Sequence, residues 1–391
     1  MQIGVLASVA LVVLVATSAE AQTSAATDSP ALHIEAPQQT PGISVAQVAA
    51  TTTVDRSQPA SSGGWYFDLS GQGSYLSGRK NFIFGTEQGP ATPAGFPTVR
   101  EFSFNLNGWG GGGSGAVGYW LTPTLGLELG MSGTQQNLSH GETCASSSAL
   151  LPVVQGQTAA TGMINFDCVE ATGQLFQERF AYSQRFLDSH FDVRFRAWES
   201  SDRRTAVELV GGVAYTNVYQ TFDVGVCCEA ADGTPAQLST DINITDNLVG
   251  GRLGVRGHHS FGGRLRVFGT ALADLYQRLS NLHATQVATN ICYDGGPCSQ
   301  SFQLRRYAAQ NQFVPRAEVA LGAAVDLVGG WSLGLFFKFD GLWNMSRPDI
   351  PRFNGTAPLG GATLADKNRV GLSGDDQIQV YSWGLALSGR F

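Results

Sequence analysis

Segment 381–391 alternates strictly between large apolar side chains and small or polar ones. One face of it carries Tyr381, Trp383, Leu385, Leu387 and Phe391. Ser, Gly, Ala and Arg side chains occupy the other face. Because successive side chains of a β-strand point to opposite faces, this period of two predicts a two-sided strand. The fold must therefore cover one apolar face and keep the opposite face in a polar or small-residue setting.

The same alternation recurs from Trp65 onward, with Trp or Tyr near many segment ends. After the first residues no run of about 18 apolar residues occurs, so a chain of this kind crosses a membrane only as a closed barrel. We predict an all-β fold, a transmembrane antiparallel up-and-down β-barrel of about ten strands (about 8–12). The expected strands are Trp65–Tyr75, Arg100–Leu121, Leu125–Ser132, Gly173–Trp198 with a bulge near Arg185, Val207–Tyr215, Asn243–Arg256, Leu265–Tyr276, Arg316–Asp326, Trp331–Asp340 and Tyr381–Phe391.

The predicted connections alternate between short and long. Short ones lie near Pro123, Asp202, His259 and Gly329. The long ones cover 77–98, 137–172, 223–242, 283–303 and 346–374. Short periplasmic turns and long external loops are typical of outer-membrane barrels, whereas a soluble sandwich has shorter strands and no such alternation.

The first residues resemble a secretory leader. An apolar run from Ile3 to Ala16 precedes the small-x-small sequence Ala19-Glu20-Ala21, although no Lys or Arg comes before the run. We assign residues 1–21 to a signal peptide. Residues 22–62 are rich in Ala, Thr, Ser, Pro and Gln without an aromatic residue, which predicts a disordered periplasmic arm. The barrel is assigned to residues 63–391.

Composition limits the partners. Glycine accounts for 49 of 391 residues, charged residues for only 14%, and the net charge is −7. This negative balance argues against nucleic acid as a partner. We expect outer-membrane lipid around the barrel and small solutes inside it, with no cofactor and no metal.

All six cysteines fall in the predicted external loops. They are Cys144 and Cys168 in one loop, Cys227 and Cys228 in another, and Cys292 and Cys298 in a third. An even number in an exported chain predicts disulfide bonds, and six cysteines allow fifteen connectivities. Local pairing would leave a strained vicinal bridge at Cys227 and Cys228, so a cross-loop pattern stays open. The spacings match no zinc pattern.

Charged side chains of both signs fall on the faces turned away from lipid. Asp68, Glu128 and Asp326 belong to this set, and the candidates for lining a pore are Asp192, Arg194, Arg196, Arg252, Arg256, Arg266, Asp274, Arg316, Glu318, Lys338 and Asp340. The plain interpretation is a salt-bridged interior. The sharper one is a selectivity zone, in which the arginines form a basic wall opposite carboxylates. Ten strands leave a narrow pore only if small inward residues provide room.

Catalysis is not expected. No GxSxG or HExxH motif and no paired catalytic carboxylates occur. His190 lies two residues from Asp192, and His140 and His283 lie in or beside loops. A single His near an Asp is more often structural, so we predict that the chain is not an enzyme.

Two features resemble known proteins. A strand that ends on an aromatic residue, here Phe391, resembles the closing strand of bacterial outer-membrane proteins, where that residue belongs to the assembly signal. The stretches Phe191–Val218, Leu248–Leu275 and Val314–Asn344 together resemble the family of Legionella-type pore-forming major outer-membrane proteins. In that family a strand, a short turn, a Gly-rich amphipathic strand and an end with Tyr or Trp recur in this order. The cysteine-bearing loops and the long arm depart from its pattern.

The resemblance implies a porin-like role in the outer membrane of a Gram-negative cell. It also implies insertion by the barrel assembly machinery, leaves a homo-oligomer open, and supplies no catalytic residues. We therefore predict a narrow pore for passive passage of small solutes. The alternative is a closed barrel that presents disulfide-braced external loops for adhesion or a structural role.

Overall fold

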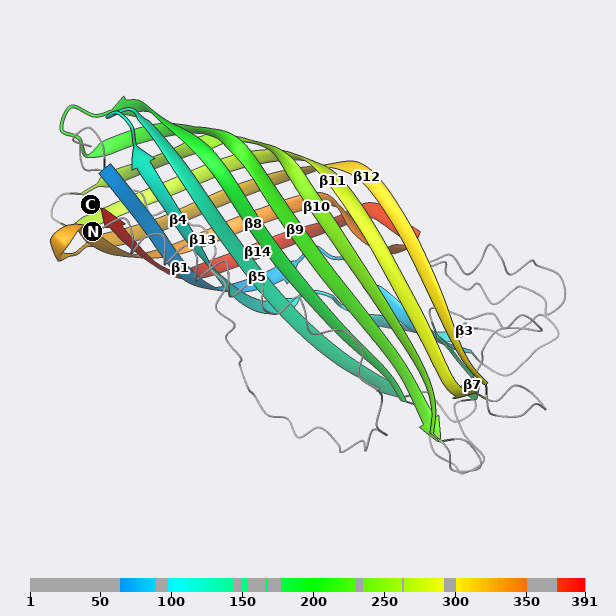
Figure 1. Ribbon diagram of the computed structural model, residues 1–391. Coiled ribbons are helices and arrows are strands. Elements are labelled where there is room, and N and C mark those ends of the chain that lie inside the picture. Colours follow the sequence, from blue (N-terminus) through cyan, green and yellow to red (C-terminus); the bar gives the residue numbers. More distant parts are fainter. Residues whose placement is uncertain are drawn as a thin grey trace, which may run out of the picture. The chain divides into compact units, whose positions relative to one another are not determined.

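Ten antiparallel strands close into a barrel (Figure 1). The computed structural model describes residues 64–88, 98–143, 149–152, 166–167, 177–229, 235–261, 264–291, 300–349 and 371–390. Around the barrel the order is β1-β14-β13-β12-β11-β10-β9-β8-β5-β4, and β4 pairs with β1. The bounds are β1 (Gly64–Ser77), β4 (Gly108–Trp120), β5 (Leu125–Thr143), β8 (Gln177–Glu199), β9 (Thr205–Glu229), β10 (Pro235–Ser260), β11 (Leu265–Ile291), β12 (Gln300–Asp326), β13 (Trp331–Asp349) and β14 (Gly371–Arg390). The predicted fold class and strand number are confirmed.

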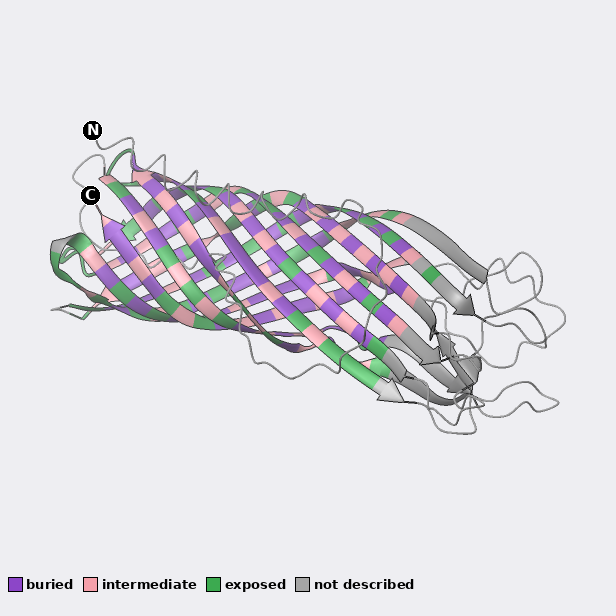
Figure 2. Ribbon diagram, turned by 60° about the horizontal axis from the view of Figure 1, so that its bottom comes forward, coloured by how far each residue is buried: buried purple, intermediate pink, exposed green. Residues whose placement is uncertain are grey.

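The closing seam joins the first and last strands. Tyr66 pairs with Arg390 and Ser77 with Gln379 in a continuous antiparallel register. On its other side β1 pairs with β4, from Gly64 opposite Trp120 to Leu76 opposite Gly108. Along the strands, buried and exposed residues alternate as the pleat requires (Figure 2).

Short turns connect strands at one end of the barrel, as predicted. They lie at 121–124, at 200–204, between the end of β10 and the start of β11, and at 327–330, where the chain forms a 3-10 turn, η1 (Val328–Gly330). In the first of them the Thr122 hydroxyl accepts a hydrogen bond from the Leu125 N–H at 2.9 Å. Gly330 has φ +82°, in the left-handed region that glycine adopts without strain.

The outer surface near the turns is an apolar belt. Its outward positions run from Val207 to Tyr215 on β9 and from Leu265 to Leu275 on β11, and Leu253 on β10 is 71% exposed. A span of about ten residues per strand matches what a tilted strand needs to cross a bilayer. The belt ends near outward amide side chains on six of the ten strands, which we call the amide ring: Gln135, Asn217, Asn247, Gln277, Asn311 and Gln379. A face this apolar predicts that the barrel spans a membrane through the belt.

Beyond the amide ring the strands continue, and their polarity reverses. On β9, Val218, Phe222 and Val224 point inward and are buried, while Asp223 points outward. The same change occurs on β10, where Ile242 and Ile244 are buried and Asp241 faces out. The barrel therefore extends past the membrane on the side of the long connections. Its wall there is largely polar outside, and inside it combines apolar residues with buried polar ones such as Gln220 and Asp246.

A second, small sheet accompanies the barrel. Its strand order is β3-β2-β6-β7, with β2 (Phe82–Gln88), β3 (Thr98–Phe104), β6 (Ala149–Pro152) and β7 (Phe166–Asp167). The predicted single strand Arg100–Leu121 is wrong, because the chain leaves this sheet at Phe104 and starts β4 at Gly108. No helix in the described part of the chain has the length and apolarity required to cross a membrane.

Two predicted loops are largely strand. β9 extends to Glu229 and β10 starts at Pro235, so 223–242 is mostly sheet, and 283–303 is shortened in the same way by β11 and β12. Cys227 and Cys228 therefore belong to the end of β9, although we predicted no cysteine in a strand. The register irregularity of β8 lies at Arg196/Trp198 rather than near Arg185.

Several predictions concern residues outside the described part. These are the signal peptide, the arm, Phe391 and the remaining cysteines Cys144, Cys168, Cys292 and Cys298. The disulfide bonds and the assembly signal stay predictions.

Candidate functional site

The lumen at the level of the belt holds a buried network of charges, and Glu128 is one of its two centres. Its Oε2 accepts hydrogen bonds from Tyr66 Oη at 2.8 Å and Arg194 Nη1 at 2.9 Å. Its Oε1 accepts one from Arg256 Nη1 at 2.9 Å. These partners come from β1, β8 and β10, so one carboxylate on β5 ties strands from several sides of the barrel.

Arg316 on β12 is the second centre. Its Nη1 donates to Asp188 Oδ1 at 2.8 Å, and its Nη2 donates to Asp340 Oδ2 at 2.6 Å and to Glu318 Oε2 at 3.2 Å. Lys338 adds an ion pair to Glu318 at 3.1 Å. The side chain of Arg316 is 0% exposed, so a solvent-free guanidinium holds β8, β12 and β13 together.

Arg252 links the two centres. It donates to Asp274 Oδ1 at 2.9 Å and lies 3.6 Å from Asp188 and 3.9 Å from Asp192. Near the turns, Arg194 and Arg196 both reach Glu208. Taking a charge out of water is costly, and only dense pairing of this kind offsets that cost. The network therefore specifies one packed arrangement of the lumen.

Local sequence explains how these side chains fit. Inward and outward residues alternate in Leu127-Glu128-Leu129, so flanking leucines face lipid while the carboxylate faces in. Glycines across the pairing leave room. A Cβ on Gly118 would lie 2.1 Å from the Tyr66 ring, and one on Gly212 would lie 2.3 Å from Asp192 Oδ1.

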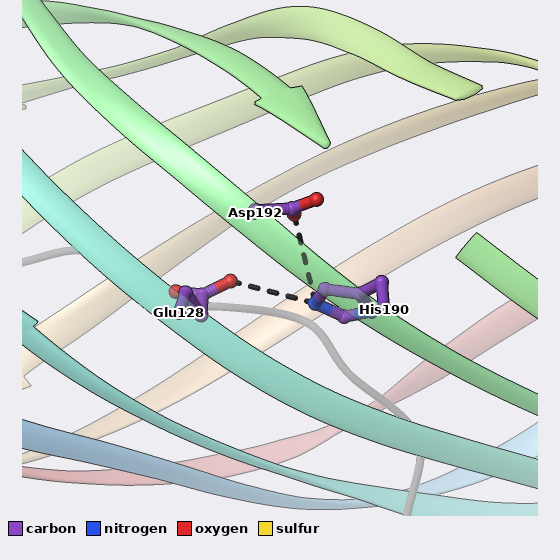
Figure 3. A group of neighbouring side chains, drawn as sticks. All are labelled: Glu128, His190 and Asp192. Atoms are coloured by element: carbon purple, nitrogen blue, oxygen red, sulfur yellow. Dashed lines mark ion pairs between the residues drawn. The ribbon is translucent and has the colours of Figure 1, made fainter. Parts of the chain in front are cut away.

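Within the network, Glu128, His190 and Asp192 form a cluster (Figure 3). The Nε2 atom of His190 lies 3.6 Å from Glu128 Oε1 and 3.7 Å from Asp192 Oδ2. All three side chains are at most 2% exposed. The strands β5 and β8 pair here, with Glu128 opposite Asp192. An imidazole and two carboxylates thus converge on one point inside the barrel.

An apolar layer fills the lumen beyond the charges, toward the long connections. It consists of Leu76, Phe186, Ala214, Val218, Leu248, Tyr276, Val314, Leu342, Met345, Ile378 and Val380. None of these residues is more than 6% exposed. These side chains therefore pack out of contact with solvent inside the barrel.

The mouth is fastened by Arg79, just after β1. Its Nε lies 2.7 Å from Asp376 Oδ2 on β14, and its Nη2 donates to Gln220 Oε1 on β9 at 2.6 Å. The Phe82 ring then packs 5.2 Å from the Phe180 ring and 4.8 Å from the Phe222 ring, centroid to centroid. The connection that follows β1 is therefore anchored inside the barrel.

An exposed ion-pair group surrounds this anchor. Asp375 lies 2.8 Å from Arg347 and 2.5 Å from Lys80, and Ser373 donates to it. These hydrogen bonds, the one from Arg347 first, lower the pKa of the Asp375 carboxyl.

The predicted pore-lining residues all point inward and are buried, with Glu318 and Arg196 both at 7% exposure and the rest lower. They do not form a basic wall opposite carboxylates. Arginines alternate with acids instead, as Arg252 with Asp274 and Arg256 with Glu128 show. Arg266 stands apart and pairs with Asp326 at 3.5 Å.

Sequence reasoning missed other members of the lumen. Tyr66, Asp188 and Glu208 have central roles, and strand alternation could have placed them inward. Arg79 follows the end of a strand, where alternation gives no prediction.

The comparisons with known proteins find only distant structural likenesses. No family model matches the sequence, and no curated protein does. Among solved structures, the chain is similar to the outer membrane protease OmpT from Escherichia coli, with 10% identity over 85% of this chain and 97% of that one, at a TM-score of 0.36. A major outer membrane protein from Thermus thermophilus has 14% identity over 83% and 99%, at a TM-score of 0.26. A Pseudomonas aeruginosa FadL homologue has 9% identity over 85% and 90%, at a TM-score of 0.20. These scores are too low to bear on chemistry, and the barrel assignment rests on this chain's own strand pairing.

Proposed function

We propose that this chain is an outer-membrane barrel with a sealed lumen, and that its function is adhesive or structural. We assign this function to the wall and the connections beyond the amide ring. This is the second of the two functions that the sequence suggested. The apolar belt supports the membrane location, since a closed barrel with such a surface leaves no unpaired backbone in lipid.

The observation that carries the proposal is the burial of the luminal charges. Arg194, Arg316 and Asp192 side chains are each at most 1% exposed. In a water-filled pore, inward charges would contact solvent and their field would select ions. Here they form ion pairs with other buried charges, and the apolar layer above them closes the passage a second time.

A narrow pore for small solutes stays a prediction, and this geometry does not favour it. To conduct, the barrel would have to part the ion pairs of Arg316 and displace the apolar layer together. The same sealing supports a non-enzymatic role, because a substrate would have no access to His190 or Asp192.

Single-channel recording in a planar bilayer tests the seal. The chain from Gly63 to Phe391 is refolded in detergent and inserted, with an open general porin as the sensitivity control. We expect no discrete current steps from correctly folded protein. Steps whose size changes in Arg194→Gln and Arg196→Gln would contradict the seal and restore the pore.

Cell display tests the adhesive role. Bacteria that carry the full chain are compared with bacteria that carry a variant in which a Gly-Ser linker replaces residues 144–176. We expect equal outer-membrane levels and weaker cell–cell or cell–surface attachment for the variant. Unchanged attachment would assign the barrel a structural role instead.

A further inference from the structure

The Glu128, His190 and Asp192 cluster contains polar atoms that lack hydrogen bonds. Within the described part of the chain, neither ring nitrogen of His190 has a hydrogen-bond partner, and neither does either carboxylate oxygen of Asp192. Their side chains are only 2% and 0% exposed. The ion-pair partners of these atoms lie 3.6–4.0 Å away. Buried polar groups are nearly always hydrogen-bonded, so these atoms keep hydrogen-bonding capacity for a bound species.

The spacing of these atoms suits a metal ion better than direct hydrogen bonds. His190 Nε2 is 3.6 Å from Glu128 Oε1 and 3.7 Å from Asp192 Oδ2, beyond the range of about 2.7–3.2 Å for N–H···O bonds. The ligand atoms all lie within 4.8 Å of one another (Figure 3). Two ligands of a tetrahedral ion with bonds of about 2.0–2.1 Å lie roughly 3.4 Å apart. Small movements of the three side chains would therefore complete such a site.

The charge of the network leaves room for a cation. Its buried carboxylates are Glu128, Asp188, Asp192, Glu208, Asp274, Glu318 and Asp340. The buried basic groups joined to them by ion pairs are Arg194, Arg196, Arg252, Arg256, Arg316 and Lys338. Among these groups seven carboxylates face six basic side chains, so the basic groups do not outnumber the carboxylates. The arginines near the cluster thus do not by themselves exclude a further cation.

We propose that this cluster is a binding site for a divalent transition-metal cation of the Zn²⁺ class. His190 Nε2, Glu128 Oε1 and Asp192 Oδ2 are its ligands. An imidazole nitrogen among carboxylates favours Zn²⁺ and its neighbours over Mg²⁺ and Ca²⁺, which take oxygen ligands. Asp188 Oδ2 lies 4.0 Å from His190 Nδ1 and can orient the ring, as outer carboxylates do at histidine–metal sites.

The burial of the ligands determines when the cation can enter the site. Because the ligands sit inside a packed lumen, the cation binds while the barrel closes, not afterwards. Once bound, it fastens β5 to β8 from within. This inference does not depend on whether the lumen conducts.

Refolding with a metal probe tests the site. The chain from Gly63 to Phe391 is refolded with Co²⁺ or Zn²⁺, desalted and analysed for bound metal, and a second sample receives the metal only after folding. We expect one Co²⁺ per barrel, with the visible absorption of a tetrahedral site, in the first sample only. Zn²⁺ present during refolding should raise the thermal unfolding midpoint.

Variants separate this site from adventitious binding. His190→Gln and Asp192→Asn should retain at least tenfold less metal, whereas His258→Gln, which alters another buried histidine of the same lumen, should retain it fully. Equal retention in His190→Gln would overturn the assignment. So would wild-type protein that folds with micromolar Zn²⁺ and carries none. If the cluster variants fail to fold, X-ray absorption of the wild-type Co²⁺ form decides, because the proposal requires one nitrogen ligand from histidine and the rest oxygen.

Discussion

At the scale of single residues, the packing of the lumen depends on pairs in which a large side chain lies opposite a glycine. Asp192 occupies space that exists because Gly212 lies opposite, and Tyr66 reaches Glu128 because Gly118 has no Cβ. A side chain at either glycine would push a hydrogen-bonded group out of the network. Each buried charge in turn relies on partners that only the closed barrel supplies.

Arg316→Leu tests that reliance. The change leaves Asp188 and Asp340 buried without their main cation, and breaking a buried pair costs about 3–5 kcal/mol. We expect a loss of that size in the free energy of unfolding, measured by urea titration in lipid vesicles. Arg204→Leu, at an exposed pair on a turn, should change it by less than about 0.5 kcal/mol. Equal effects would show that the luminal pairs contribute no more than surface ones.

Asp223 and Asp241 predict a pH dependence outside the membrane. They lie opposite each other on the outer face of β9 and β10. Partial burial, then the hydrogen bond and repulsion from Asp241, raise the pKa of Asp223 to about 6. Since the native state holds this proton more tightly than the unfolded chain, the pair costs stability as the pH rises from about 4 through 6.

Asp241→Asn should remove the part of that cost that comes from Asp241, whereas the part due to the burial of Asp223 stays. We expect the variant to be more stable than wild type by roughly 0.5–1 kcal/mol at pH 8, with the difference vanishing near pH 4. Urea unfolding at a series of pH values measures it. A difference that does not change with pH would argue against the shared proton.

At the scale of strands, each long strand passes through two environments, the apolar belt and the part of the wall beyond it. On β10 the outward face is apolar from Val249 to Val255 and polar from Asp241 to Asn247. The inward face carries arginines in the belt, and beyond it Ile242, Ile244 and Leu248 beside the buried Asp246. The strand keeps its period of two throughout, because the pleat sets it. Only the solvent on each side differs.

Leu253→Arg and Thr245→Arg, on the same strand, test where the membrane ends. An arginine at Leu253 would face hydrocarbon and should cost about 2–4 kcal/mol. At Thr245, beyond the amide ring, the cost should be below about 1 kcal/mol. Both are measured by unfolding from vesicles. Similar costs at the two positions would move the edge of the belt.

At the scale of the whole molecule, the barrel is closed by contacts between segments far apart in sequence. The side chain of Arg79 joins the end of β1 to β14 and β9, above an apolar layer to which β1, β8, β9, β10, β11, β12, β13 and β14 contribute. The mouth and the lumen are thus held as one packed body.

Arg79→Ala should loosen the mouth. Asp376 would stay buried without its cation, so we expect a loss of about 2–4 kcal/mol and faster hydrogen exchange at Arg79–Phe82. Lys80→Ala, next in the chain but paired at the exposed Asp375, is the control and should change little. If both variants exchange alike, Arg79 is not what fastens the mouth.

The sequence by itself determined the strands of the belt and the direction of their side chains. Alternation placed Leu253 outward and Arg252 inward without reference to any neighbour, because the pleat is a local property of the chain. It also predicted the short turns, since these follow the ends of the apolar stripes.

Only the tertiary structure decided which charges meet and whether the lumen is open. Arg256 and Glu128 are 128 residues apart, and their contact depends on strand tilt and closure that no local pattern encodes. The sequence predicts loops where the strands continue beyond the belt, because the outward face is polar there. A strand with a polar outer face can be recognised only when the strands across the barrel are known to cover its inner face. The predicted pore-lining residues form a buried network for the same reason, because side chains from opposite strands pack against one another across the closed barrel.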